Sequence, residues 1–101
     1  MENNTITNPA EQVEMGDRYY HGDGVEQDYE QAIFWYTKAA EQGNADAQYN
    51  LGLMYYYGDG AEEDWELGWE WIEKAAIQGH EEAFEMWRGD GDDDGRYDGY
   101  V

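Results

Sequence analysis

Closely spaced carboxylates lie at the end of the sequence, where residues 89–101 read GDGDDDGRYDGYV. Ca²⁺ prefers oxygen ligands, and a calcium-binding EF-hand loop supplies them from positions 1, 3, 5 and 9, with glycine at position 6 and glutamate at position 12. The residues in this register are Asp90, Asp92, Asp94, Gly95 and Asp98. Val101 stands where the bidentate glutamate is required, so calcium binding is the weaker interpretation. The favoured ones are an acidic extension that adds charge, or an acidic arm that contacts a partner.

The charge of the whole chain narrows the partners that it can bind. Its 25 acidic residues outnumber its 5 basic residues, for a net charge of −20. Nucleic acids and anionic membrane surfaces both attract clustered lysine and arginine side chains. The composition therefore argues against direct binding to nucleic acid or to a membrane, and it favours a basic protein as the partner. Solubility alone is the other explanation of this charge.

Few residues offer the chemistry of an enzyme or of a bound cofactor. The chain has no cysteine and no serine, which leaves threonine, tyrosine and carboxylate side chains as nucleophiles. His21 and His80 lack metal-ligand spacing, and neither GDG segment carries the basic residue of a phosphate-binding loop. We therefore expect a non-enzymatic protein without a cofactor. Because the sequence shows neither a secretory leader nor a long apolar stretch, we expect it to be cytoplasmic.

The elements that position these residues follow from an internal repeat. Residues 8–43 align without a gap on residues 44–79, and 17 of the 36 positions are identical. Each copy predicts two helices, because a GDG segment interrupts the helical pattern and glycine adopts the left-handed conformation that ends helices. We expect the first helices at about residues 10–21 and 45–57. Asp28 and Asp64 are predicted to cap the second helices, which then end at Gly43 and Gly79.

A glycine recurs inside the first helix of each copy, at Gly16 and Gly52. Glycine costs about 1 kcal/mol relative to alanine in a helix interior. Its recurrence therefore predicts a close crossing of two helices, facing Ala32 in the first copy and Gly68 in the second.

A third copy begins after residue 79 but is incomplete. Ala83 matches Ala47, and Trp87 takes the place of Leu51. Repeat arrays need a terminal cap because their last apolar face has no neighbour. We expect a capping helix over residues 81–88 that stops at Gly89.

The segments LGLMYYYGDG and DWELGWEWIEKAAIQG, at residues 51–60 and 64–79, resemble the Sel-one-like repeat family, an α/α relative of the tetratricopeptide repeat. Met15 and Gly68 depart from the leucine and alanine that are usual there. The resemblance implies an all-α fold, a short right-handed α/α solenoid of two helix-turn-helix repeats plus a C-terminal capping helix. It also implies an adaptor or scaffold rather than an enzyme, without naming a partner. The boundaries are a tail at 1–8, repeats at 9–44 and 45–80, the cap at 81–88 and an acidic tail at 89–101.

In such an array we expect the first helix of each repeat to line a concave groove. The residues facing away from the expected core differ between the copies: Val13, Glu14, Asp17 and His21 in the first, and Tyr49, Asn50, Leu53 and Tyr57 in the second. Apolar anchors beside carboxylates suit a protein partner, although ordinary exposed side chains would show the same pattern. The expected core aromatic residues are Tyr19, Trp35, Tyr55, Trp65, Trp69 and Trp71.

These observations predict a non-enzymatic interaction module, a monomer or small oligomer, that captures a basic protein. A nucleic-acid-binding protein or a toxin would fit, and the module would act as an inhibitor, immunity-type protein or DNA mimic. The expected partner-binding residues are Glu14, Asp17, His21, Tyr49, Asn50, Leu53, Tyr57, Asp90, Asp92 and Asp94. The alternative is a calcium-responsive adaptor that uses the aspartate-rich C-terminal loop.

Overall fold

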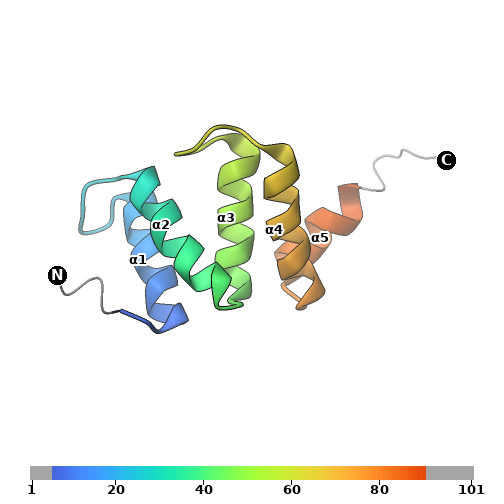
Figure 1. Cartoon of the computed structure of the whole chain (residues 1–101), viewed down its shortest axis with the longest axis horizontal. Helices are drawn as coiled ribbons and strands as arrows, with labels where there is room; N and C mark the ends of the chain where they lie inside the picture. The colour runs from blue at the N-terminus through green and yellow to red at the C-terminus, as the bar shows by residue number, and fades with distance from the viewer. Residues whose placement is uncertain (1–5, 91–101) are drawn as a thin grey trace.

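The computed structural model describes residues 6–90, with the side chain of Asp90 excepted, and this part of the chain contains helices and no strand. The five helices are α1 (Pro9–His21), α2 (Tyr29–Glu41), α3 (Ala45–Tyr57), α4 (Trp65–Ile77) and α5 (Glu81–Asp90). They follow one another along the long axis of the molecule, as Figure 1 shows. The prediction of an all-α helical repeat solenoid is confirmed. None of the helices in this range has the length and apolar character needed to cross a membrane.

The predicted caps are present at the starts of the helices. The Asp28 carboxylate accepts a hydrogen bond from the Gln31 amide at 3.2 Å, and the Asp64 carboxylate accepts one from the Leu67 amide at 3.0 Å. These bonds satisfy amides that have no partner within the helix. Asn8 and Asn44 cap α1 and α3 in the same way.

The GDG segments end α1 and α3 as predicted. Gly22 and Gly58 both lie in the left-handed region, with φ of 72° and 75°. The second segment also packs on the preceding repeat, because a Cβ placed on Gly60 would lie 2.7 Å from the Cβ of Tyr29 on α2. The equivalent glycine of the first segment, Gly24, has only the Arg18 side chain within 4 Å of such a Cβ. The loop of residues 58–60 is therefore held between repeats, whereas the loop of residues 22–24 is open.

The close helix crossing predicted at Gly52 is confirmed. A Cβ on Gly52 would lie 2.7 Å from the carbonyl oxygen of Gly68, so the backbones of α3 and α4 touch. At Gly16 the nearest atoms belong to a residue that the prediction did not name, and that Ala32 also faces this glycine stays a prediction. The space beside Gly16 is filled by the ring of Tyr36, whose nearest carbon would lie 2.5 Å from a Cβ there.

The core consists mainly of alanine, with a few large side chains. One cluster joins α2 and α3, and a second joins α4 and α5. Ala47 and Ala83, matched in the sequence, are both fully buried. The assignment of Trp65 to the core is wrong, because its side chain is 65% exposed and its indole N–H donates to the Glu63 carboxylate. Trp65 is the first residue of α4 after the Asp64 cap, and its ring lies at the helix end beside Tyr56 of α3, with ring centroids 6.4 Å apart.

The capping helix differs from its prediction at its end. α5 continues through Gly89 to Asp90 rather than stopping at Gly89. His80 begins the helix by accepting a hydrogen bond from the Ala83 amide at its Nδ1 atom. Trp87, which takes the place of the buried Leu51, is 37% exposed, since no further helix follows in the described part of the chain.

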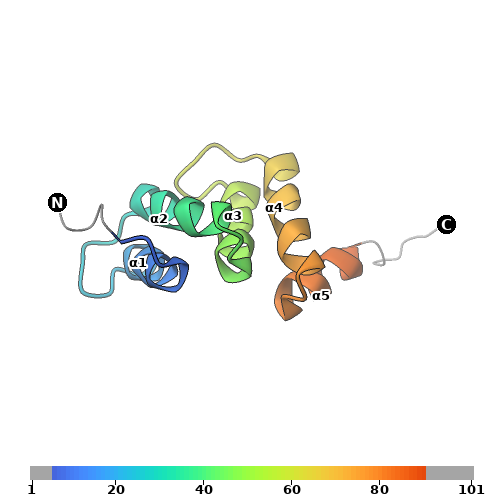
Figure 2. The same cartoon turned by 60° about the horizontal axis from the view of Figure 1, so that its bottom comes forward.

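Two glutamine pairs join consecutive helices at the same repeat positions. Gln42 donates to the Gln12 side chain at 2.8 Å, and Gln78 donates to the Gln48 side chain at 2.9 Å. Gln12 and Gln48 are buried, so each pair satisfies amide groups that would otherwise be costly to bury. The described part measures 53 × 24 × 19 Å, and its main contacts join helices that are consecutive in sequence (Figure 2). The chain is thus a short, quasi-linear array.

Candidate functional site

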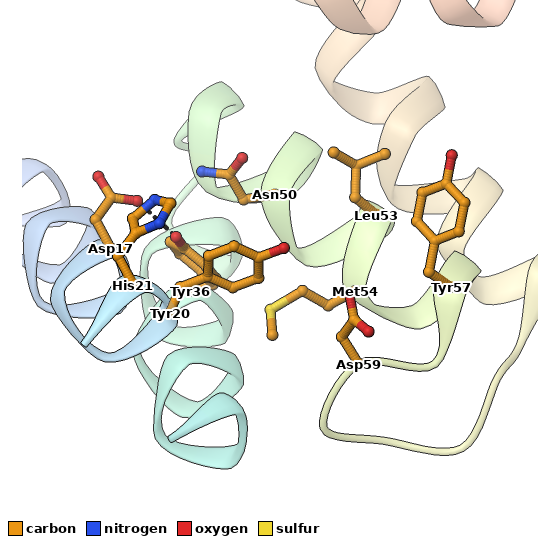
Figure 3. Close-up of a pocket in the computed structure, with 9 residues that line it drawn as sticks. All are labelled: Asp17, Tyr20, His21, Tyr36, Asn50, Leu53, Met54, Tyr57 and Asp59. Carbon is orange, nitrogen blue, oxygen red and sulfur yellow. Dashed lines mark hydrogen bonds between the residues drawn. The ribbon is translucent and has the colours of Figure 1, made fainter. Parts of the chain in front are cut away.

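A cavity of about 270 Å³ opens at the junction of the two repeats, between α1 and α3. It draws residues from α1, α2, α3 and the loop after α3, as Figure 3 shows. Its lining consists of Asp17, Tyr20, His21, Tyr36, Asn50, Leu53, Met54, Tyr57 and Asp59. The cavity therefore exists only where two repeats meet.

Asp17 is held in the wall of this cavity by Tyr36. The phenolic O–H of Tyr36 donates to the Asp17 carboxylate at 2.5 Å, across the crossing of α1 and α2. Tyr36 is buried, and this burial, together with the hydrogen bond to Asp17, raises the pKa of the phenol far above its ordinary value of 10.0. Tyr36 thus keeps its proton at physiological pH and remains a donor. One carboxylate oxygen of Asp17 is engaged by it, while a carboxylate has about four acceptor sites in all.

A second carboxylate enters the cavity from the loop of residues 58–60. The Asp59 amide donates to the Met54 carbonyl, which fixes the loop against the end of α3. Tyr20 lies near this carboxylate, since burial and then the charge of Asp59 raise the pKa of the Tyr20 phenol. Asp17 and Asp59 therefore lie on different sides of the same cavity, with the labelled Tyr20 between them in Figure 3.

The remaining wall is contributed by α3 and is largely apolar. Met54 is buried, Leu53 is half-buried, and Tyr57 is 61% exposed at the outer edge. Asn50 adds an amide to this wall from one turn earlier in α3. The cavity thus combines an apolar floor with carboxylates.

The lysine and arginine side chains of the described residues are engaged outside the cavity. Arg18 pairs with Glu14 at 3.4 Å, and Arg88 pairs with Glu85 at 3.3 Å. The ammonium groups of Lys38 and Lys74 lie over the rings of Phe34 and Trp71, at 5.2 and 5.9 Å from the ring centroids. Neither lysine nor arginine is among the residues that line the cavity. The negative charges of Asp17 and Asp59 are therefore not neutralised by a lysine or arginine in the lining of the cavity.

Five of the predicted partner-binding residues meet in this cavity, namely Asp17, His21, Asn50, Leu53 and Tyr57. Glu14 lies outside it and pairs with Arg18 on the exposed side of α1. Tyr49 also lies outside it, where its ring stacks on His80 with centroids 4.7 Å apart. Its phenol has a raised pKa because of burial and then the charge of Glu82.

The predicted acidic arm and calcium loop lie outside what the structure describes. Asp92, Asp94 and Asp98 fall beyond residue 90, and Asp90 is described only as the last residue of α5. Within the described residues, no three histidine or acidic side chains come together in a group that could hold a metal ion. The candidate site therefore consists of the residues that line the cavity, without the C-terminal aspartates.

The sequence prediction missed four of the lining residues, namely Tyr20, Tyr36, Met54 and Asp59. Tyr20 and Asp59 belong to YY and GDG segments that are identical in the two copies, whereas the predicted binding residues on the first helices lie where the copies differ. Tyr36 carried a usable signal, because its counterpart in the second copy is Ile72 and the counterpart of its partner Asp17 is Leu53. When a polar pair in one copy is an apolar pair in the other, the two copies present different chemistry at that place, which indicates a candidate binding surface.

The family model of the Sel1 repeat matches residues 12–44 and 45–80 of this chain. No curated protein matches it. Among solved structures, a Sel1 repeat protein from Oxalobacter formigenes is 46% identical and superposes with a TM-score of 0.79, over 80% of this chain and 33% of that one.

Two further structures show the same fold. The protective antigen c5321 of uropathogenic Escherichia coli, which displays an SLR fold, is 41% identical with a TM-score of 0.76, over 77% of this chain and 17% of that one. Cysteine-rich protein B of Helicobacter pylori is 28% identical with a TM-score of 0.73, over 77% of this chain and 59% of that one. The chain therefore spans less than two thirds of the length of each of these relatives.

Proposed function

The chain belongs to the Sel1 repeat family, and from this premise we propose that it is a non-catalytic module whose acidic concave side captures a basic protein. Sel1 repeat proteins are generally protein-interaction modules, and the family is typically a non-enzymatic scaffold. The basic character of the partner is our addition.

One observation carries this proposal. The inter-repeat cavity holds Asp17 and Asp59 beside an apolar floor, while the lysine and arginine side chains of the described residues are engaged elsewhere. Carboxylates in a concave site attract a complementary charge more strongly than the same carboxylates on a convex surface, because the low-dielectric walls focus the field. The net charge of −20 extends this attraction to longer range and favours rapid encounter with a basic partner.

The size of the array favours one partner at a time. Two helix pairs and a cap, 53 Å in the longest dimension, present one inter-repeat cavity with this lining. Capture of this kind suits an inhibitor or immunity-type protein that covers the basic surface of a nucleic-acid-binding protein or a toxin. Mimicry of DNA by the carboxylates is the most specific form of the proposal.

Affinity capture with the whole chain as bait, followed by a salt series, tests the proposal. We expect a basic protein to be captured in a one-to-one complex and to be released between about 50 mM and about 500 mM salt, because screening shortens the reach of exposed charges. Thermal unfolding over the same range is the control. The bait should become more stable as its self-repulsion is screened, so release cannot come from unfolding. A partner whose affinity does not change with salt would contradict the proposal.

A further inference from the structure

We infer that the inter-repeat cavity takes one arginine side chain of the basic partner, an assignment that rests on the function proposed above. The site is formed by Asp17 and Asp59 with the tyrosines and the apolar floor of α3. The inference names the residue type that the module recognises and the atoms that recognise it.

The volume of the cavity suits a single side chain. At about 270 Å³ it lies below the range of roughly 300–1,000 Å³ typical of sites for drug-sized ligands and cofactors. Its floor is formed by Leu53 and Met54, against which the aliphatic stem of a long cationic side chain can pack. A short acidic or amide side chain would leave this floor uncovered.

The carboxylates of the cavity supply acceptors for a cationic head group. Tyr36 donates one hydrogen bond to one oxygen of Asp17, and a carboxylate has about four acceptor sites in all. Asp59 provides a second carboxylate on the other side of Tyr20. An incoming carboxylate would be repelled by both of them, so an acidic segment is excluded.

The planar guanidinium fits this arrangement better than the ammonium of lysine. Tyr20 and Tyr57 contribute aromatic rings to the lining, and guanidinium stacks on such rings and is more weakly hydrated than ammonium. Arginine presents paired donors that can bond to a carboxylate in parallel, whereas lysine presents a point charge. These two features together favour arginine.

Three matched peptides test the assignment. Each is a blocked heptapeptide, Gly-Lys-Gly-Xaa-Gly-Lys-Gly, with arginine, lysine or the neutral isostere citrulline at the central position. We expect the arginine peptide to bind roughly fivefold more tightly than the lysine peptide, because arginine can form two parallel bonds to one carboxylate. The citrulline peptide should bind most weakly, since charge-assisted bonds are about twice as strong as neutral ones. Methyl resonances of Met54 and Leu53 should shift with the arginine peptide.

Two variants localise the effect. Asp17→Asn and Asp59→Asn should each weaken binding of the arginine peptide about tenfold, because truncating one partner of a charge pair typically costs this much or more. Asp23→Asn is the matched control: Asp23 occupies the position of Asp59 in the first GDG segment, is exposed, and does not line the cavity. It removes the same charge and should weaken binding less than twofold. Circular dichroism melts show that each variant is folded at the temperature of the titration.

The outcomes separate the two proposals. Equal weakening by Asp17→Asn, Asp59→Asn and Asp23→Asn, or unshifted methyl resonances of Met54 and Leu53, overturns the arginine site and leaves capture by the general charge intact. A lysine peptide that binds as tightly as the arginine peptide also overturns it. Failure of both cationic peptides to bind at low salt, with a basic protein still captured by the whole chain, overturns the arginine site alone. Failure of that capture as well overturns the proposed function.

Discussion

In the first repeat, the phenol of Tyr36 reaches from α2 to Asp17 on α1, whereas in the second repeat the same two positions hold Ile72 on α4 and Leu53 on α3. Both pairs lie where two helices cross beside a glycine, Gly16 or Gly52. The exchange replaces a polar contact between the two helices with an apolar one, while both repeats keep the same pair of helices. The repeat thus keeps its fold through shared positions and acquires a binding surface through positions that differ.

The two crossings also differ in how closely the backbones approach. At Gly52 a Cβ would meet the carbonyl oxygen of Gly68 at 2.7 Å, and at Gly16 it would meet the ring of Tyr36 at 2.5 Å. A backbone cannot move aside without shifting a helix, whereas a ring can rotate if its hydrogen bond is given up. The second crossing is therefore the more rigid of the two.

Substitution of the crossing glycines should show this difference most strongly. Gly52→Ala should lower the free energy of unfolding by roughly 2–3 kcal/mol, because the overpacking strain exceeds the gain in helix propensity. Gly16→Ala should cost about 1 kcal/mol, because the ring of Tyr36 can yield. Urea unfolding followed by circular dichroism measures both. A Gly16→Ala variant less stable than Gly52→Ala would contradict the ranking.

The contribution of the Tyr36–Asp17 contact to stability should depend on alkaline pH, whereas that of Ile72 and Leu53 should not. Because the folded chain raises the pKa of Tyr36 above its ordinary value of 10.0, the stability that comes from the protonated phenol is fully present below pH 10 and is lost as the pH rises above it. Tyr36→Phe should cost about 1.5 kcal/mol at neutral pH, the worth of a hydrogen bond to a charged group. It should also make the fall in stability above pH 10 shallower.

The measurement is urea unfolding at a series of pH values from neutral to about 11, a range that brackets the ordinary tyrosine pKa. Ile72→Val is the matched control, because it alters the equivalent position of the second repeat without changing a titratable group. It should lower stability equally at every pH. A Tyr36→Phe variant with the pH profile of the unaltered chain would show that Tyr36 does not titrate with unfolding.

The caps should show the smallest effects and no difference between the repeats. Asp28→Ala and Asp64→Ala should each cost about 1 kcal/mol, the usual loss for a removed N-cap. The matched Asp28→Asn and Asp64→Asn variants keep an accepting oxygen and should stay near the unaltered stability. Thermal melts of the four variants check this. Unequal losses at Asp28 and Asp64 would contradict the expectation that the two caps contribute equally to stability.

Much of the fold could be predicted because it depends on local rules. The caps at Asp28 and Asp64, and the left-handed glycines at Gly22 and Gly58, act within a few residues of themselves, so their spacing in the sequence is enough. The crossing at Gly52 was predictable for another reason, since glycine inside a helix is costly and its recurrence requires a close neighbour. Trp65 was misplaced because helical spacing alone does not distinguish the end of a helix from its packed middle.

The candidate site could be predicted only in part. Asp17, His21, Asn50, Leu53 and Tyr57 were found because they vary between the copies on helices expected to line a groove. Tyr36 and Asp59 were missed, since one lies on α2 and the other in a loop that both copies share. Their place in the cavity depends on how the second repeat packs on the first, which Gly60 against Tyr29 illustrates.

The sequence by itself determined the number of helices, the bounds of the helices in the two repeats to within a few residues, and the close crossing at Gly52, because hydrogen-bonded caps, positive φ angles and helical periodicity are short-range properties. It also determined the strongly negative charge. Only the tertiary structure decided which carboxylates share a cavity, because the stacking angle between repeats brings Asp17 and Asp59 together across more than a full repeat of sequence. Only the tertiary structure, too, placed the ring of Tyr36 beside Gly16, because its long side chain fills the space that the glycine leaves and reaches the carboxylate of Asp17 there.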